Sequence, residues 1–360
     1  MSLNNKFHPL KITEVRRETA DAVSIRFEIP ADLKDAFAFK AGQHLTLKAL
    51  IDGKDTRRNY SVCVAPSENE IRIAVKQMPR GAFSSWANTA LAVGQTIEVL
   101  PPMGRFTLAQ SDAASPHYVG FAGGSGITPV ISILKTVLEA RRDASFTLLY
   151  GNRDSASIMF LEELAALKNR YLDRLEIYHF LEDEAEEIEL FNGRLDRTKC
   201  DEVLSHLVDP ANVTGFFICG PGPMMDAVET ALLAHNVSPA RILIERFTTG
   251  AVPAAQLAED EALQQKAAGN KLSVTLDGRT RAIAFDPAKG NILDCVQAAG
   301  MPAPYACKGG VCTTCRAKVV SGSVTMKKNY GLTEEEVAQG YVLTCQAVPT
   351  SDNVTLNYDA

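Results

Sequence analysis

Long apolar segments and a strong excess of one charge are both missing from this chain of 360 residues. No apolar run approaches the roughly 18 residues that a membrane-spanning helix requires, and the N-terminal segment lacks the basic and apolar parts of a secretion signal. The net charge is -6, which gives no electrostatic reason to expect a nucleic acid. We therefore expect a cytoplasmic protein with no membrane and no nucleic-acid partner.

Histidine pairs with metal-ligand spacing and common hydrolase motifs are also absent. The six histidines are scattered along the chain, and we expect structural or surface roles for all of them. No serine-hydrolase elbow, Walker loop or zinc-protease motif is present. The sequence therefore gives no support to these hydrolase and nucleotide-hydrolysing classes.

Cysteine occurs eight times, but its spacing argues against disulfides, which a cytoplasmic chain of this size neither needs nor readily keeps oxidised. Four cysteines are isolated in the sequence: Cys63, Cys200, Cys219 and Cys295. The other four have the C-x4-C-x2-C spacing followed by a distant fourth residue: Cys307, Cys312, Cys315 and Cys345. This spacing is typical of plant-type 2Fe-2S ligation.

The loop around these four cysteines supports the same interpretation. Gly309 and Gly310 tolerate positive φ and allow the backbone to wrap closely around a cluster, whose anionic sulfurs can accept backbone N–H groups. A four-cysteine zinc site is the alternative. Structural zinc sites usually pair their ligands as two short hooks, which this arrangement of three plus one does not do.

The hydrophobic pattern divides the chain into segments of different character. Short alternating runs up to about Phe106 predict an antiparallel β-barrel, and the alternation of apolar strands with helical stretches after Pro116 predicts a parallel sheet covered by helices on both faces. An Ala-, Gln- and Glu-rich stretch without a strand pattern predicts a linker, for which a partly helical conformation is the alternative. The predicted boundaries are 1–110 for the barrel, 111–249 for the α/β domain, 250–270 for the linker and 271–360 for a third, α+β domain.

Glycine-rich turns follow three of the predicted parallel strands. Gly120–Pro129 lies where a strand becomes a helix and can bring backbone N–H groups to a pyrophosphate, although it is not the usual dinucleotide fingerprint and could be merely structural. The other two turns are Gly151-Asn152-Arg153 and Gly220–Met224. All three lie at carboxyl ends of parallel strands, where such sheets bind their ligands.

Two resemblances to known families add to this interpretation. Pro304–Arg316 and Leu343–Gln346 closely resemble plant-type ferredoxins, which implies a β-grasp fold for the third domain. The glycine-rich turns, together with Arg58-Asn59-Tyr60-Ser61 and Gly81–Ser84, resemble the ferredoxin-NADP reductase superfamily. That second resemblance implies that the barrel binds a flavin and that the α/β domain binds a nicotinamide nucleotide.

The superfamily resemblance also implies roles for individual residues. It assigns flavin binding to Arg58, Tyr60, Ser61, Lys76, Gly81, Phe83, Ser84 and Phe247, with Arg58 on a phosphate and Tyr60 on the isoalloxazine. It assigns nucleotide binding to Gly123, Gly124, Gly126, Thr128, Gly151, Asn152, Arg153, Cys219, Gly220, Pro221 and Met224. Ser61, Cys219 and Glu245 are the implied catalytic residues, which position groups and stabilise charge. A small buried residue at a strand end is the alternative for Cys219.

These assignments predict a reductase with FAD, a 2Fe-2S cluster and a nicotinamide nucleotide. A flavin is needed because the nucleotide gives two electrons as hydride whereas the cluster accepts one at a time. FMN is the rival flavin. We favour NADPH over NADH because Arg153 follows the second strand, where a basic side chain could meet the 2'-phosphate, although the adjacent Asp154 would oppose it.

The domain order is that of the family of phenylacetyl-CoA epoxygenase reductase subunits and their relatives. The resemblance implies an oxygenase component as electron acceptor, most simply a diiron phenylacetyl-CoA epoxygenase. Another acceptor, such as a Rieske-type or other oxygenase or a hybrid-cluster protein, is the first alternative, and a redox-sensing or docking module is the second. Residues 271–360 hold nine Lys/Arg against eight Asp/Glu, so we expect a basic docking face around the cluster, at Lys308, Arg316, Lys327 and Lys328.

Overall fold

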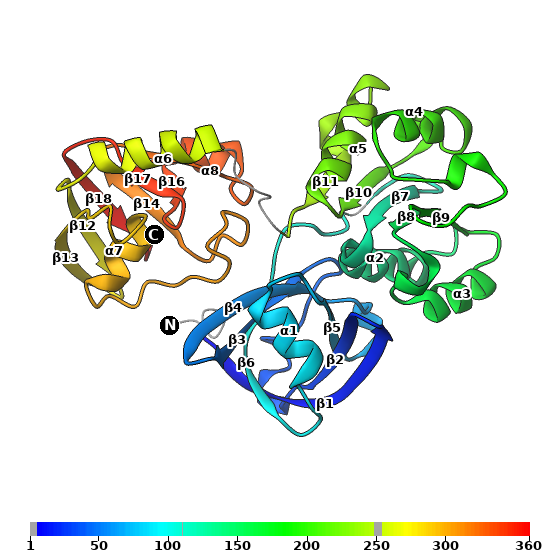
Figure 1. Cartoon of the computed structure of the whole chain (residues 1–360), viewed down its shortest axis with the longest axis horizontal. Coiled ribbons are helices and arrows are strands. Elements are labelled where there is room, and N and C mark those ends of the chain that lie inside the picture. Colours follow the sequence, from blue (N-terminus) through cyan, green and yellow to red (C-terminus); the bar gives the residue numbers. More distant parts are fainter. Residues whose placement is uncertain (1–5, 110, 248–253) are drawn as a thin grey trace. The chain divides into compact units, whose positions relative to one another are not determined.

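The computed structural model describes residues 6–109, 111–247 and 254–360. These residues form two compact units, one spanning Lys6–Arg246 and the other beginning at Phe247 and ending at Ala360 (Figure 1). No helix in the described ranges has the length and apolar composition needed to cross a membrane.

The first unit begins with a six-stranded antiparallel sheet in the order β4-β3-β6-β1-β2-β5. An isolated bridge between Val62 and Ile73 connects the two ends of this order, as the predicted barrel requires. Alternate residues of β1 point inward, so Leu10 and Ile12 are fully buried in the core. The elements are β1 (His8–Thr19), β2 (Ala22–Glu28), β3 (His44–Ile51), β4 (Lys54–Ser61), β5 (Ile71–Lys76), α1 (Ala82–Thr89) and β6 (Thr96–Met103).

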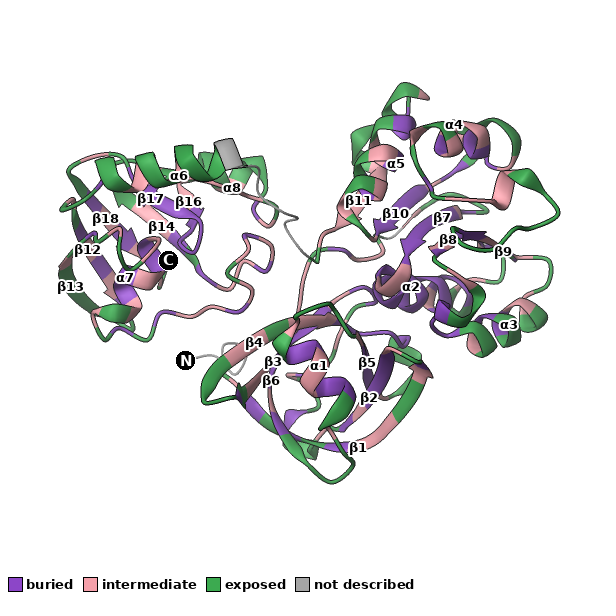
Figure 2. Ribbon diagram, viewed as in Figure 1, coloured by how far each residue is buried: buried purple, intermediate pink, exposed green. Residues whose placement is uncertain are grey.

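The second half of this unit is a five-stranded parallel sheet in the order β11-β10-β7-β8-β9. Helices α2 and α3 pack on one face, and α4 and α5 pack on the other. The central strands are therefore buried on both sides, as Figure 2 shows. The elements are β7 (His117–Gly123), α2 (Ile127–Ala140), β8 (Ser145–Asn152), α3 (Leu161–Arg170), β9 (Leu175–Leu181), α4 (Arg197–His206), β10 (Gly215–Cys219), α5 (Gly222–Ala234) and β11 (Ile242–Glu245).

The order of this sheet reverses between β7 and β10. The chain proceeds from β7 outward to β8 and β9, then returns to the other side of β7 for β10 and β11. Open α/β sheets bind ligands at such a switch point, outside the carboxyl ends of the strands. The glycine-rich turns after β7 and β10 lie at this point.

The second unit contains a mixed five-stranded sheet in the order β13-β12-β18-β14-β16, with a small two-stranded sheet of β15 and β17. Strands β12 and β18 are parallel and the other neighbours are antiparallel. Asp277 and Gly278, both with positive φ, form the turn between β12 and β13. The elements are α6 (Ala254–Lys266), β12 (Lys271–Leu276), β13 (Arg279–Ala284), α7 (Ile292–Ala298), β14 (Arg316–Ser321), β15 (Val324–Met326), α8 (Glu334–Ala338), β16 (Tyr341–Leu343), β17 (Ala347–Pro349) and β18 (Asn353–Asn357).

Helix α6 occupies much of the stretch that the sequence predicted as a linker. Leu263 packs against the core of the second unit and Ala267 is 3% exposed. Gln264 Nε2 also donates a hydrogen bond of 2.9 Å to Asn291 Oδ1. Residues 254–270 therefore belong to the second unit, because a helix with an apolar side is stabilised by burying that side. Residues 250–253 of the predicted linker lie outside the described residues.

Candidate active site and cluster site

A cavity of about 420 Å³ lies at the carboxyl ends of the parallel strands in the first unit. Eight residues that the sequence predicted for cofactor binding line it: Lys76, Gly123, Gly124, Gly151, Asn152, Arg153, Pro221 and Met224. Both side-chain amide atoms of Asn152 are buried without a hydrogen-bond partner among the described residues. A buried amide in this state is costly unless a ligand satisfies it.

The glycines beside this cavity are required by close packing. A Cβ on Gly126 would lie 2.0 Å from the carbonyl oxygen of Cys219, and one on Gly123 would lie 2.8 Å from Met224 Sδ. Gly220 has the same constraint, since its Cβ would lie 3.0 Å from the amide nitrogen of Gly123. The turns after β7 and β10 therefore approach each other at backbone distance, which a residue with a side chain would prevent.

Two further predicted residues lie at these turns: Thr128 hydrogen-bonds the first turn, and Cys219 directly precedes the second. Thr128, 2% exposed, donates a hydrogen bond of 3.0 Å from Oγ1 to the carbonyl oxygen of Ser125. Cys219 ends β10, and burial raises the pKa of its thiol well above the usual value, with the Glu245 carboxylate adding to the shift. Cys219 is therefore a neutral thiol at physiological pH, which suits a packing surface rather than a nucleophile.

The predicted flavin motif lies on β4 and α1 of the barrel. The rings of Tyr60 and Phe83 are 5.5 Å apart, and burial raises the pKa of the Tyr60 hydroxyl, which keeps it neutral. Ser84 Oγ accepts a hydrogen bond of 3.0 Å from the backbone N–H of Met78 and donates to the carbonyl of Gly81. Arg58 donates to the carbonyl oxygen of Arg57, so its guanidinium keeps donors for a phosphate.

The buried end of β4 lies next to a histidine that the sequence analysis assigned only a structural or surface role. Ser61 pairs with His44 of β3 in the strand register, and Ser61 Oγ is buried without a partner in the described structure. His44 Nδ1 lies 3.6 Å from Glu245 Oε1, with both side chains largely buried. Glu245 in turn pairs with Cys219 in the register of β11 and β10. His44 is thus a strand neighbour of Ser61 and a side-chain contact of Glu245, and Cys219 is the strand neighbour of Glu245.

Phe247 is the remaining predicted flavin contact. Its side chain is 41% exposed, and it is the residue at which the second unit begins. Its assignment to the flavin remains a prediction.

The structure also adds residues to the nucleotide cavity that the sequence analysis missed. Phe180 and Glu182 come from the end of β9, and Arg194 comes from the loop that follows. Glu182 Oε2 accepts a hydrogen bond of 2.8 Å from Arg194 Nε. The rule that ligands bind at carboxyl ends of parallel strands could have identified Phe180 and Glu182, but no local motif marks Arg194.

The four predicted cluster ligands lie together in the second unit as two pairs, Cys307 with Cys312 and Cys315 with Cys345. A hydrogen bond from Cys312 lowers the pKa of Cys307, and one from Cys315 lowers that of Cys345. No three cysteine, histidine or carboxylate side chains of the described chain gather as ligands of one ion would. Two pairs of thiolates fit a cluster with two irons.

The backbone around the thiols also fits an anionic cluster. The amide nitrogen of Gly309 lies 3.3 Å from Cys307 Sγ, and that of Cys312 lies 3.4 Å from the same sulfur. Lys308, Gly310 and Thr313 all have positive φ, which turns the loop tightly enough to point its amides inward. Cys345 is held from the other side, where Asn291 and Gln346 both donate to its carbonyl oxygen.

These observations define a class of protein. A barrel with a flavin motif, a parallel sheet with a nucleotide cavity and a loop of four paired cysteines together make an iron-sulfur flavoprotein reductase. Comparison with known families agrees for each part. Residues 9–108 match the oxidoreductase FAD-binding domain, residues 121–230 the oxidoreductase NAD-binding domain, and residues 274–350 the 2Fe-2S iron-sulfur cluster binding domain.

Full-length relatives extend this result. The chain is 41% identical over 354 residues to a subunit of the 1,2-phenylacetyl-CoA epoxidase of Escherichia coli, covering 98% of each protein. It is 36% identical over 353 residues to the ferredoxin reductase component of a 3-ketosteroid-9-alpha-monooxygenase from Rhodococcus rhodochrous, covering 97% of this chain and 96% of the relative. The chain therefore belongs to the ferredoxin-NADP reductase superfamily, among the reductase components of oxygenase systems that carry a C-terminal 2Fe-2S domain.

Solved structures show the same fold. Phthalate dioxygenase reductase matches with a TM-score of 0.60 at 24% identity, covering 98% of each chain. An intact type IV self-sufficient cytochrome P450 monooxygenase matches with a TM-score of 0.70 at 25% identity, covering 97% of this chain and 41% of that one. The multi-domain fold predicted from the sequence is confirmed.

Proposed function

We propose that this reductase takes electrons from NADPH and delivers them to a diiron phenylacetyl-CoA epoxidase. The observation that carries the proposal is the 41% identity, over nearly the whole length, to a subunit of a 1,2-phenylacetyl-CoA epoxidase. Both proteins therefore share all three cofactor-binding domains and the connections between them. The domains are proposed to span 1–110, 111–249 and 271–360, except that helix α6 joins the third.

We assign the residues of the first unit as follows. A bound flavin would accept hydride from the nucleotide and release electrons singly. Arg58 would pair with a flavin phosphate and Tyr60 would contact the ring, while the unpartnered Ser61 hydroxyl is available to hydrogen-bond it. The Glu245 carboxylate, 3.6 Å from His44 Nδ1, would stabilise charge, and the neutral Cys219 thiol would form a wall of the nucleotide site.

The preference for NADPH is supported by the charge of the nucleotide cavity. Lys76, Arg153 and Arg194 all line it, and Arg194 is held by its hydrogen bond to Glu182. Two carboxylates, Glu182 and Asp196, line the same cavity. Arg153 Nε already contacts Asp154 Oδ2 at 2.8 Å, and this ion pair must open or turn to admit the phosphate.

A second acceptor is favoured by a separate observation. The chain is also 36% identical over nearly its full length to the reductase component of a 3-ketosteroid monooxygenase. The same three-domain reductase therefore serves different oxygenases in different relatives. Another oxygenase is accordingly the competing assignment for this chain.

The test is direct reconstitution with purified partners. The holoprotein is first mixed with NADPH and an artificial acceptor, which distinguishes a reductase from a sensing module. It is then combined with the oxygenase subunits of a phenylacetyl-CoA epoxidase or of a 3-ketosteroid monooxygenase, each with its own substrate. We expect substrate-dependent NADPH oxidation with the epoxidase alone. Efficient coupling only to the ketosteroid enzyme would overturn the assigned acceptor and leave the reductase chemistry intact.

A further inference from the structure

Helix α2 carries a polar stripe that contacts the barrel loop following the flavin motif. Ser132, Lys135 and Glu139 lie three and four residues apart, so they share one face of the helix. Ser132 Oγ donates a hydrogen bond of 2.6 Å to the carbonyl oxygen of Val64. Ser67 Oγ donates to the Glu139 carboxylate, which extends the same contact by one more turn.

Lys135 is the centre of this stripe. It is 3% exposed, and its ammonium lies 3.0 Å from Glu68 Oε1 and 3.5 Å from the carbonyl oxygen of Cys63. It also forms an ion pair with Glu163 of α3. Burial lowers the pKa of Lys135, but Glu163 and Glu68 raise it by more, so the ammonium stays protonated. One buried cation thus connects two helices of the nucleotide half with the barrel.

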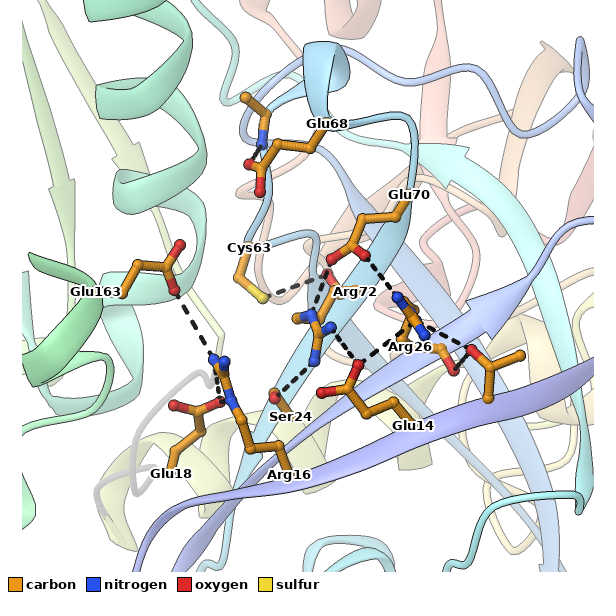
Figure 3. A network of polar contacts seen from close by, with 12 residues as sticks. Glu14, Arg16, Glu18, Ser24, Arg26, Cys63, Glu68, Glu70, Arg72 and Glu163 are labelled. Atoms are coloured by element: carbon orange, nitrogen blue, oxygen red, sulfur yellow. Dashed lines mark hydrogen bonds and ion pairs between the residues drawn. The ribbon is translucent and has the colours of Figure 1, made fainter. Parts of the chain in front are cut away.

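The surroundings of Lys135 extend the contact onto the barrel strands. Glu163 also lies 3.9 Å from Arg16 of β1, which in turn pairs with Glu18 at 2.8 Å, as Figure 3 shows. Glu68 accepts a hydrogen bond from the backbone N–H of Ala65, which fixes the loop that Lys135 contacts. Buried charges are retained only where they are paired and hydrogen-bonded in this way.

The contact between helix α2 and the barrel loop lies between the two halves of the proposed reaction site. Helix α2 begins at Ile127, directly after the glycine turn of the nucleotide cavity. Cys63 and Val64 follow Ser61, the last residue of the flavin motif, within three positions. From Ile127 to Lys135 the helix rises roughly 12 Å, at 1.5 Å per residue. Helix α2 therefore joins the glycine turn of the nucleotide cavity to the segment that follows Tyr60 and Ser61 on β4.

We propose that Ser132 and Lys135 are positioning residues for hydride transfer. They hold the glycine turn before α2 at a fixed distance from β4, which carries the flavin motif. The inference rests on the proposed function of both sites. In that reaction a C–H bond of the nicotinamide breaks, an N–H bond of the flavin forms, and two electrons move with the hydride. A misplacement of about 1 Å between the reacting groups can cost on the order of 100-fold in rate. Side chains far from the reacting atoms can therefore control it.

The experiment compares Ser132→Ala and Lys135→Met with the parent holoprotein. Thr136→Ala is the matched control, because Thr136 Oγ1 lies on the same helix and donates only to the carbonyl of Ser132, at 2.7 Å. Flavin reduction is followed by anaerobic stopped flow over a range of NADPH concentrations. We expect each test variant to reduce flavin at least about 10-fold more slowly at saturation, with the nucleotide dissociation constant within about threefold of the parent.

Two further measurements separate positioning from stability. The charge-transfer absorbance between nicotinamide and flavin reports their stacking directly and should weaken in both test variants. Hydrogen exchange at the amides of residues 62–68 should accelerate in the same variants and stay at the parent level in Thr136→Ala. Because Lys135→Met removes the buried cation that Glu68 and Glu163 share and can impair folding, the combined Lys135→Met, Glu68→Gln, Glu163→Gln variant replaces it if needed.

Each outcome decides the proposal. Slow reduction with a weakened charge-transfer band and retained nucleotide binding supports it. Parent rates and a parent band in Ser132→Ala and the Lys135 variant, even with a lowered melting temperature, would show that the stripe is structural only. If the parent itself fails to reduce flavin with nucleotide, the proposed function fails and takes this inference with it, and that result is seen before any variant is measured.

Discussion

The four paired cysteines are the residues for which substitution has the clearest consequence. We expect Cys307→Ser, Cys312→Ser, Cys315→Ser and Cys345→Ser each to lose the intact cluster, because each change removes one of four thiolates. Cys63→Ser and Cys295→Ser are the controls, since Cys63 lies in the first unit and the Cys295 thiol hydrogen-bonds the backbone of Asp286. Iron and sulfide analysis of the purified variants measures the outcome. Flavin reduction by nucleotide should survive, and normal iron content in any of the first four would contradict the prediction.

Arg153 is the residue on which the choice between NADPH and NADH can be tested. It lines the nucleotide cavity with a 63% exposed side chain. Arg153→Ala should lower kcat/KM for NADPH by about 10-fold or more and leave that for NADH nearly unchanged, because one charge-assisted contact to the 2'-phosphate contributes about 1.5–3 kcal/mol. Arg197→Ala, whose side chain pairs with Asp201 on α4, is the control. An unchanged preference for NADPH over NADH in Arg153→Ala would remove the argument for NADPH.

Helix α6 provides the test at the level of secondary structure. Leu263 packs against the core of the second unit, whereas Leu257 on the same helix is 48% exposed. We expect Leu263→Ala to destabilise this unit by about 1–2 kcal/mol and Leu257→Ala to change it by less than about 0.5 kcal/mol. Urea unfolding of the full chain, followed by cluster absorbance, measures both. Equal effects would mean that α6 is not docked, and the linker prediction would stand.

The strands and helices that bear the site could be predicted because their patterns are local. The alternation in β1 and the glycine turn before α2 are each contained within a short stretch of sequence. The packing of helix α6 on the second unit was not predicted because its apolar side is narrow, with Leu263 as the leucine on it that packs against the core. Such a helix depends on its partner surface, which a single stretch of sequence does not reveal.

For the whole molecule, the predicted basic docking face is modified by the structure. Lys308 Nζ contacts Asp294 Oδ1 at 2.7 Å, and Arg316 contacts Glu336 Oε1 at 3.0 Å. Burial lowers the pKa of Lys327. These cations are therefore partly compensated within the unit, so we expect weaker steering of an acidic partner than the sequence alone indicates.

The corresponding experiment replaces Lys308, Arg316, Lys327 and Lys328 with Gln in the full-length reductase. Reduction of the natural acceptor should slow by about two- to fivefold at low salt and recover the parent rate at high salt, since exposed charges mainly affect association and are screened. Reduction of the cluster by nucleotide is the internal control and should not change. Identical partner turnover at every salt concentration would show that these side chains are ordinary solvated charges.

The sequence by itself determined the chemistry: the four cluster ligands, the flavin strand and the glycine turns. Each of these is a motif in which the residues that act together are close along the chain, so covalent spacing already constrains their geometry. The family follows from the order of these motifs.

Only the tertiary structure decided which distant residues meet. The approach of His44 to Glu245, the pairing of Glu182 with Arg194 and the contact of Lys135 with the loop at Cys63 join segments that are separate in sequence. In isolation, His44 is one scattered histidine and Lys135 is one lysine in an apolar helix. Their roles arise because folding removes water from around them and leaves a specific partner as the only way to satisfy a buried polar group.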